Sequence, residues 1–170
     1  MDHRYFFYRL LHPRIALQAF LNLAANHCSL KAIFADRSPI PETSGKVSKI
    51  AEAPELDTVL KSNKYVVVDF YADWCPPCRA IAPVFSKFAD DHAVAGQLAF
   101  AKVNVDHVKN VAQKYGITAM PTFLFFENGK PTEVKVERRG AEEKVQMVRG
   151  ADVPVLRSVV QELAKRVQSS

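Results

Sequence analysis

One hexapeptide, Trp74-Cys75-Pro76-Pro77-Cys78-Arg79, constrains this chain more than any other stretch. The residues before it, 65–71, are mostly β-branched or aromatic, as in a buried strand. Apolar residues then recur at helical spacing over residues 80–89. Two cysteines three positions apart at the start of a helix lie about one turn from each other. The sequence therefore predicts a cysteine pair whose side chains can meet between a strand and a helix.

The position of each cysteine predicts its chemistry. Cys75 lies nearest the helix N-terminus, where the partial positive charge of the helix favours a thiolate. A thiolate is the nucleophile in thiol–disulfide exchange. Cys78, one turn deeper, is placed to attack the mixed disulfide and release the product. We therefore predict that Cys75 attacks and that Cys78 resolves.

Two other interpretations of the cysteine pair are weaker. A closed zinc site needs four ligands, but the only other cysteine is Cys28, and no second CxxC or paired-histidine pattern occurs. A purely structural disulfide would close a very short loop and stabilise the fold little. A CxxC beside a strand–helix–strand pattern is typical of a redox motif, so no metal is expected.

Three segments resemble the thioredoxin family, in the family's order: residues 66–83, 101–106 and 115–123. The resemblance runs from about Lys46 to the C-terminus with one interruption. It departs from the family pattern at Pro76, where typical thioredoxins carry glycine. The resemblance implies a thioredoxin fold, an α/β fold with a mixed central sheet flanked by helices on both faces. The alternation of strands and helices, followed by a hairpin and a last helix, favours the same class.

The local patterns predict where the elements lie. Asp106 is expected to cap a short helix that ends near Tyr115, Asn128-Gly129 to turn a hairpin, and Pro83 to kink the active-site helix. Strands are expected at residues 47–51, 65–71, 98–105 and 122–127, and helices at 54–61, 75–92 and from about Asp152 onward.

Asp69 is a carboxylate within an apolar strand, and burial there would raise its pKa. Such a poised group can accept the proton of Cys78 during resolution. The resemblance implies this role for Asp69 and implies that Lys102, on the neighbouring strand, modulates it. The alternatives are a carboxylate that reaches solvent and an ordinary surface lysine.

The resemblance also implies a substrate-binding surface beside the cysteines. It implies that the Met120–Pro121 bond is cis and that the Met120 backbone pairs with an extended substrate. Trp74 is expected to shield the site and to form part of the docking surface, and Pro77 to stiffen it. Pro76 has no N–H to donate to the attacking thiolate and should tune the redox potential, in a direction that the sequence does not fix.

Residues 1–45 differ from the rest of the chain, and residues 38–45 have the composition of a linker. Arg4, Arg9 and Arg14 precede or begin an amphipathic stretch over residues 15–25, in a segment poor in acidic residues. This pattern resembles a mitochondrial transit peptide, and the stretch is too short to span a membrane. A secretory signal and a plain leader on a cytoplasmic protein remain open. We expect a targeting or disordered extension over residues 1–45 and a thioredoxin domain over residues 46–170.

Residues 132–144 exceed what a typical thioredoxin carries between its last hairpin and last helix. Eight of them are charged. We expect a surface insertion that extends the hairpin into solvent, and a partner-docking site is the alternative.

These features together predict a protein dithiol–disulfide oxidoreductase that reduces protein disulfides through Cys75 and Cys78. The resemblance implies disulfide-containing protein substrates, recycling by a thioredoxin reductase-type electron donor, no tightly bound cofactor and a monomer. The net charge of +5 includes no basic run with interleaved aromatics, so no nucleic acid is expected. The alternatives are a thiol oxidase or isomerase in an oxidising compartment and a non-catalytic binding module.

Overall fold

The computed structural model describes residues 36–138 and 140–169 of this protein. Residues 1–35 of the expected N-terminal extension, including Cys28, lie outside the described residues.

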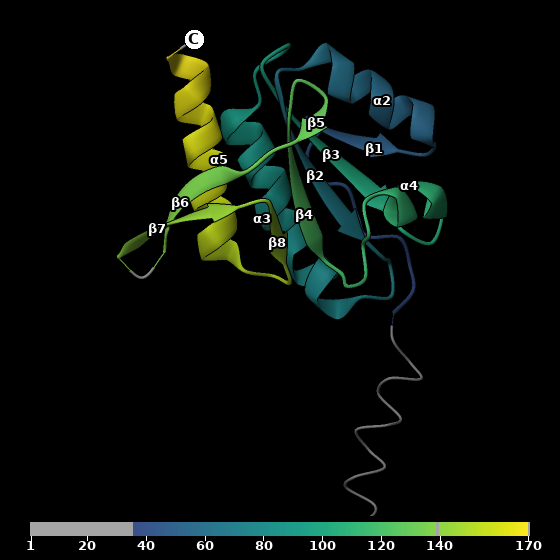
Figure 1. Cartoon of the computed structure of the whole chain (residues 1–170). Helices are drawn as coiled ribbons and strands as arrows, with labels where there is room; N and C mark the ends of the chain where they lie inside the picture. The colour runs from purple at the N-terminus through teal and green to yellow at the C-terminus, as the bar shows by residue number, and fades with distance from the viewer. Residues whose placement is uncertain (1–35, 139, 170) are drawn as a thin grey trace, which may run out of the picture. The chain divides into compact units, whose positions relative to one another are not determined.

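The described residues form a mixed sheet with helices on both of its faces (Figure 1). Strand β3 runs parallel to β1 and to β2, whereas β4 runs antiparallel to β2. The strand order is β1-β3-β2-β4-β5, with β8 also paired to β4. The elements are β1 (Val47–Ile50), α2 (Ala53–Ser62), β2 (Tyr65–Tyr71), α3 (Pro76–His92), β3 (Leu98–Asn104), α4 (Lys109–Lys114), β4 (Thr122–Glu127), β5 (Lys130–Pro131), β6 (Val134–Arg138), β7 (Ala141–Val145), β8 (Met147–Arg149) and α5 (Val153–Gln168).

Strand β2 is central, and each of its residues is buried. Its side chains alternate between the two faces of the sheet. Val67 packs in one core cluster with α3 and α5, whereas Val66 and Val68 pack in a second cluster with α2 and α4. The apolar run in the sequence thus reflects a strand that is covered on both sides, and the predicted fold class is confirmed.

Most predicted elements agree with the structure, and β2 and β4 have the expected bounds. The hairpin prediction is confirmed, since Asn128 and Gly129 both have positive φ, 50° and 78°. The prediction that Asp106 caps the short helix is wrong, because Val108 is the N-cap of α4. The Asp106 carboxylate accepts a hydrogen bond from Trp74 instead.

The last edge strand of the sheet is split into β5 and β8, which pair with opposite ends of β4 (Figure 1). If the register of β5 continued, Leu124 would pair with Glu133. It pairs instead with Met147, fourteen residues further on. The inserted residues form a separate antiparallel hairpin, β6–β7. The insertion is therefore an excursion from the edge strand rather than a longer β4–β5 hairpin.

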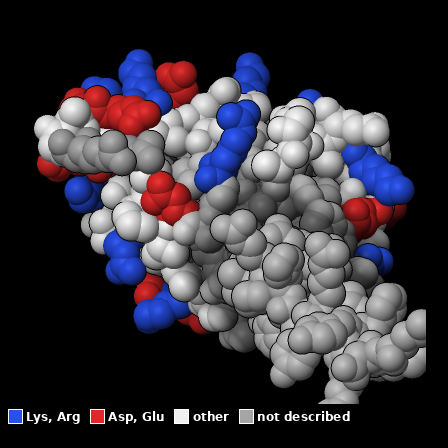
Figure 2. Space-filling view, turned by 90° about the horizontal axis from the view of Figure 1, so that it is seen from below, with Lys and Arg blue, Asp and Glu red and all other residues white. Residues whose placement is uncertain are grey.

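One face of the β6–β7 hairpin is buried, which differs from the expected solvated extension. Val134 and Val136 are 0% and 4% exposed and belong to the same core cluster as the apolar face of α5. Lys135 and Glu142, on the other face, are exposed and 3.9 Å apart. Seen from below, acidic and basic side chains stand next to one another on the side where Figure 1 draws the hairpin (Figure 2).

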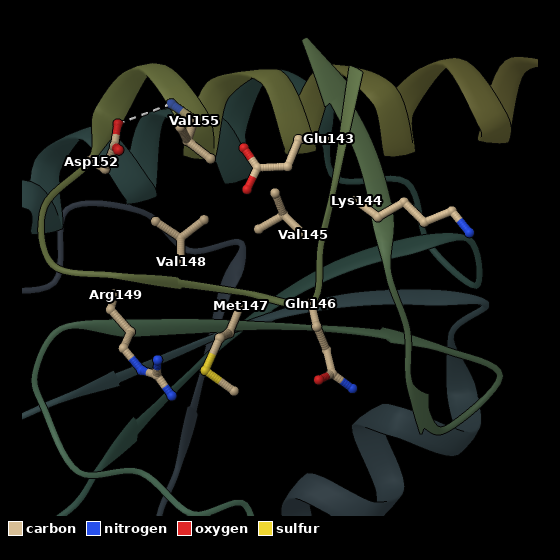
Figure 3. A pocket seen from close by; sticks show the side chains of 9 residues that line it. All are labelled: Glu143, Lys144, Val145, Gln146, Met147, Val148, Arg149, Asp152 and Val155. Atoms are coloured by element: carbon tan, nitrogen blue, oxygen red, sulfur yellow. Dashed lines mark hydrogen bonds between the residues drawn. The ribbon is translucent and has the colours of Figure 1, made fainter. Parts of the chain in front are cut away.

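A pocket of about 350 Å³ lies where the hairpin rejoins the sheet. Val145 and Val148 point from the strands toward α5, whereas Met147 and Arg149 point away from it (Figure 3). Neither cysteine of the CxxC motif lines this pocket.

Residues 38–44, which we call the N-terminal strap, contain no helix or strand but pack on the domain, contrary to the linker prediction. Ile40 is 9% exposed, and its backbone N–H donates to the Asp73 carboxylate over 3.0 Å. The buried Ser44 hydroxyl donates to the Asp90 carboxylate over 2.6 Å. The folded domain therefore begins before Lys46.

The docked hairpin predicts unequal costs for two neighbouring substitutions. Val134→Ala should lower the free energy of unfolding by about 2 kcal/mol, since it removes buried methyl groups and leaves a cavity. Lys135→Ala is the matched control and should change it by less than about 0.5 kcal/mol. Urea denaturation of both variants measures this difference, and equal small effects would show that the hairpin does not pack on α5.

Candidate active site

The cysteine pair lies at the first turn of α3. Cys75 is the N-cap, with φ −89° and ψ 107°, and Pro76 and Pro77 are the first two helical residues. Proline suits these positions, because their N–H groups would have no partner within the helix. Cys78 donates its backbone N–H to Cys75 Sγ over 3.3 Å, and the two cysteines form a disulfide with a Cα–Cα distance of 5.3 Å.

Exposure differs sharply around the disulfide. Cys75 and Cys78 are 3% and 1% exposed, whereas Pro76 and Pro77 are exposed and Trp74 is 42% exposed. Burial limits access to the sulfurs, and the exposed residues form a rim beside them. In the reduced state, the N-terminus of the 17-residue helix α3 would favour a thiolate at Cys75.

The Trp74 side chain is held by Asp106, a residue whose role the sequence analysis missed. Trp74 Nε1 donates to Asp106 Oδ2 over 2.8 Å. Asp106 lies after β3, and its own N–H donates to the Asn104 side chain over 2.9 Å. The hydrogen bond from Trp74 to Asp106 holds the indole in place, although much of the indole surface is exposed to solvent. The sequence offers one signal for this role, since Asp106 lies in a segment that resembles the family. Its partner Trp74 is 32 residues away, so no local pattern shows the contact.

The Met120–Pro121 peptide bond is cis, as the resemblance implied. Pro121 is buried, and its carbonyl accepts the N–H of Gly150 over 2.7 Å. Met120 is partly buried and packs on the cluster that contains Cys75 and Cys78. The structure thus brings the cis-proline segment and the cysteine motif together.

Asp69 is buried in β2, 4% exposed, with Lys102 of β3 and Phe123 of β4 as its register partners. It shares the alternation of Val67, so it faces the side of the sheet that α3 covers. Among the described residues, Asp69 Oδ1 has no hydrogen-bond partner. Burial raises the pKa of Asp69 to about 7, and the Lys102 ammonium opposes part of that rise.

Lys102 is also buried, at 7% exposed, and is not a surface lysine. Its Nζ lies 5.6 Å from the centre of the Tyr71 ring. It forms an ion pair with Glu42 of the N-terminal strap. The sequence analysis missed Glu42, because it placed this segment in a linker.

Asp73 and Arg79 tie the strap to the active-site loop. Asp73 accepts hydrogen bonds from the Ile40 N–H and, over 2.8 Å, from Asn104 Nδ2. Arg79 Nη2 donates to the carbonyls of Ser38 and Asp73 over 2.6 and 2.7 Å. The residues flanking the CxxC motif therefore hold the strap against it.

The described residues contain neither a metal-binding cluster nor a membrane-spanning helix. No group of three or more histidine, cysteine, aspartate or glutamate side chains in residues 36–138 and 140–169 could hold a metal ion. Within the same ranges, no helix has both the length and the apolar composition needed to cross a membrane.

Comparison with known proteins identifies the family. Residues 47–151 match the family model "Thioredoxin". A thioredoxin-like protein of Fusarium culmorum is 48% identical over 122 residues, which cover 72% of this chain and 94% of the relative.

Solved structures agree with the family match. The thioredoxin of Malassezia sympodialis is 38% identical, with a TM-score of 0.56 over 71% of this chain and 92% of that one. Mitochondrial thioredoxin 3 of Saccharomyces cerevisiae is 26% identical, with a TM-score of 0.54 over 68% and 93%. With a disulfide across its CxxC motif, this chain belongs to the thioredoxin family and is a dithiol–disulfide oxidoreductase with protein-disulfide reductase activity.

Proposed function

We propose that Cys75 is the attacking thiol and Cys78 the resolving thiol. The Cys75 thiolate attacks one sulfur of a substrate disulfide, and the other substrate sulfur leaves as a thiolate. Cys78 then attacks Cys75 Sγ, which releases the second substrate thiolate and forms the Cys75–Cys78 disulfide. Two electrons pass from the enzyme to the substrate. The observation that carries this assignment is the disulfide across the first turn of α3 with Cys75 at the N-cap.

Asp69 acts as the proton acceptor for Cys78 in this proposal, and Lys102 modulates it. A carboxylate whose pKa is raised to about 7 can take a proton near neutral pH. Its position on the face of β2 that α3 covers supports this role.

The substrate binds along the exposed rim in this proposal. Trp74, Pro76 and Pro77 supply the exposed surface. Met120 offers its backbone to an extended substrate segment beside Pro121, as an added strand would require. The packing of Met120 against the cysteine cluster supports this placement.

A thioredoxin reductase-type donor returns the Cys75–Cys78 disulfide to the dithiol, and the protein acts as a monomer on disulfide-containing proteins.

We also propose a mitochondrial location, which imaging of the tagged full chain would test. The arginine-containing, acid-poor N-terminal segment supports it, as does the likeness to a yeast mitochondrial thioredoxin. Secretory and cytoplasmic locations are the alternatives.

The redox potential of the Cys75–Cys78 pair separates the proposed reductase from an oxidase or isomerase. We expect a strongly reducing value of about −270 mV, against about −120 mV for a strong oxidant. Titration of the Cys28→Ser chain against glutathione, with thiol trapping, measures it without the third thiol. A value near that of the oxidant would assign the protein to the oxidase class. If the protein bound a protein partner fully but reduced no disulfide, it would be a binding module.

Alkylation tests the order of the two thiols. At mildly acidic pH, iodoacetamide should modify Cys75 of the reduced Cys28→Ser chain before Cys78, because the N-terminus of α3 favours the Cys75 thiolate. Peptide mass mapping over time gives the order. Cys78→Ser is the matched control, and in this variant only the slowly modified site should disappear. Faster modification of Cys78 would reverse the assignment.

Replacing the buried carboxylate tests the proton acceptor. Asp69→Asn should slow the release of substrate from the Cys75 mixed disulfide by about 100-fold or more at pH 7, since an amide does not accept the Cys78 proton. Stopped-flow measurement of single-turnover release gives this rate. An unchanged rate would exclude Asp69 as the acceptor.

The pH dependence of the free energy of unfolding tests whether Asp69 is the group whose pKa is raised. In the folded state the pKa of Asp69 is raised from 3.8 to about 7, so the folded chain holds a proton that the unfolded chain releases. Stability should therefore fall as pH rises from about 4 to about 7, by up to about 4 kcal/mol. Asp69→Asn should remove this fall and be more stable than the unchanged chain at pH 8. A persistent fall would show that another group causes it.

A further inference from the structure

The N-terminal strap carries Glu42 to a buried lysine of the active site. Glu42 lies midway between two anchored residues of the strap. Ile40 is buried and donates its N–H to Asp73, and the Ser44 hydroxyl donates to Asp90. Between these anchors, the Glu42 carboxylate forms an ion pair with the Lys102 ammonium.

We infer that Glu42 is a positioning residue that holds Lys102 and thereby sets the proton affinity of Asp69. This inference rests on the proposed role of Asp69 in resolution. Glu42 acts through Lys102 and touches neither the cysteines nor the substrate in this account.

The Lys102 ammonium acts on two carboxylates, those of Asp69 and Glu42. Lys102 lies opposite Asp69 in the β2–β3 register, and both side chains are at least nine-tenths buried. The Glu42 side chain is 37% exposed and approaches Lys102 from the strap. A cation attracts a nearby carboxylate less strongly when a second carboxylate is paired with it. Glu42 therefore reduces the degree to which Lys102 favours the charged form of Asp69.

The other groups around this cluster do not replace Glu42. Tyr71 lies under Lys102, and burial, followed by the Asp73 charge, raises its pKa to about 12, so its phenol stays neutral near pH 7. Asp73 is hydrogen-bonded to Ile40 and Asn104. From β4, the register partner of Asp69 is the uncharged Phe123.

From α3, the titratable side chains of the site are the thiols of Cys75 and Cys78, which are joined in the disulfide form. The oxidised protein is therefore the form in which the coupling of Glu42, Lys102 and Asp69 can be read without thiol ionisation.

The experiment measures the titration of Asp69 directly. The carboxyl ¹³C shift of Asp69 is followed against pH by NMR in the oxidised full chain and in Glu42→Gln. We expect the midpoint to fall by about half a pH unit or more in Glu42→Gln, because Lys102 then acts on Asp69 alone. An unchanged or higher midpoint would overturn the inference.

Three further variants separate this coupling from a structural effect. Glu42→Asp keeps the charge and should have a midpoint closer to that of the unchanged chain than to Glu42→Gln. Asp57→Asn removes a surface partner of Lys114, 3.9 Å away, and should not move the midpoint. In a Lys102→Gln background, Glu42→Gln should have no further effect. A full shift in that background, or equal midpoints for Glu42→Asp and Glu42→Gln, would overturn the inference.

Failure of this inference can be told from failure of the proposed acceptor role. The NMR midpoint reports the ionisation of Asp69 whether or not that group takes part in resolution. An unchanged release rate in Asp69→Asn would refute the acceptor role alone, whereas an unchanged midpoint in Glu42→Gln would refute the coupling alone.

Discussion

The rest of the structure depends on the complete burial of β2. A strand that is buried on both faces needs a hydrogen-bonded neighbour on each edge and a helical layer on each side. Strands β3 and β4 supply the neighbours, and α3 with α5 and α2 with α4 supply the layers. The chain leaves the end of β2 directly into the cysteine loop, so the strand fixes where the redox pair lies.

The same burial creates the chemistry of Asp69. Two opposed effects act on its carboxyl group, and burial outweighs the Lys102 charge, because the pKa is raised rather than lowered. The Lys102 ammonium is also paired with Glu42, so part of its effect is directed away from Asp69. The position of Glu42 therefore affects how far the Asp69 pKa rises.

Sequence predicted the elements whose patterns are local, and missed the contacts that are not. The β-branched run of β2 and the helical spacing of α3 are sufficient to locate them. Asp106 precedes a helix, and nothing local shows that its carboxylate meets an indole 32 residues away. The strap was predicted to be a linker because its two prolines and two serines disfavour regular structure. Its partners Asp73 and Asp90 lie 33 and 46 residues from Ile40 and Ser44.

The sequence contains a pattern that indicates how the insertion folds. Val134 and Val136 alternate with Lys135 and Glu137, which is the period of a strand with one buried face. The eight charged residues of the insertion instead favoured the prediction of an extension into solvent.

The structure explains why such an insertion is compatible with the site. Strand β8 pairs again with β4 at Thr122, immediately after the cis-proline. The Gly150 N–H therefore still reaches the Pro121 carbonyl, although fourteen residues have been added upstream. Closing a longer loop costs little more entropy than closing a short one. The two valines buried against α5 offset that cost.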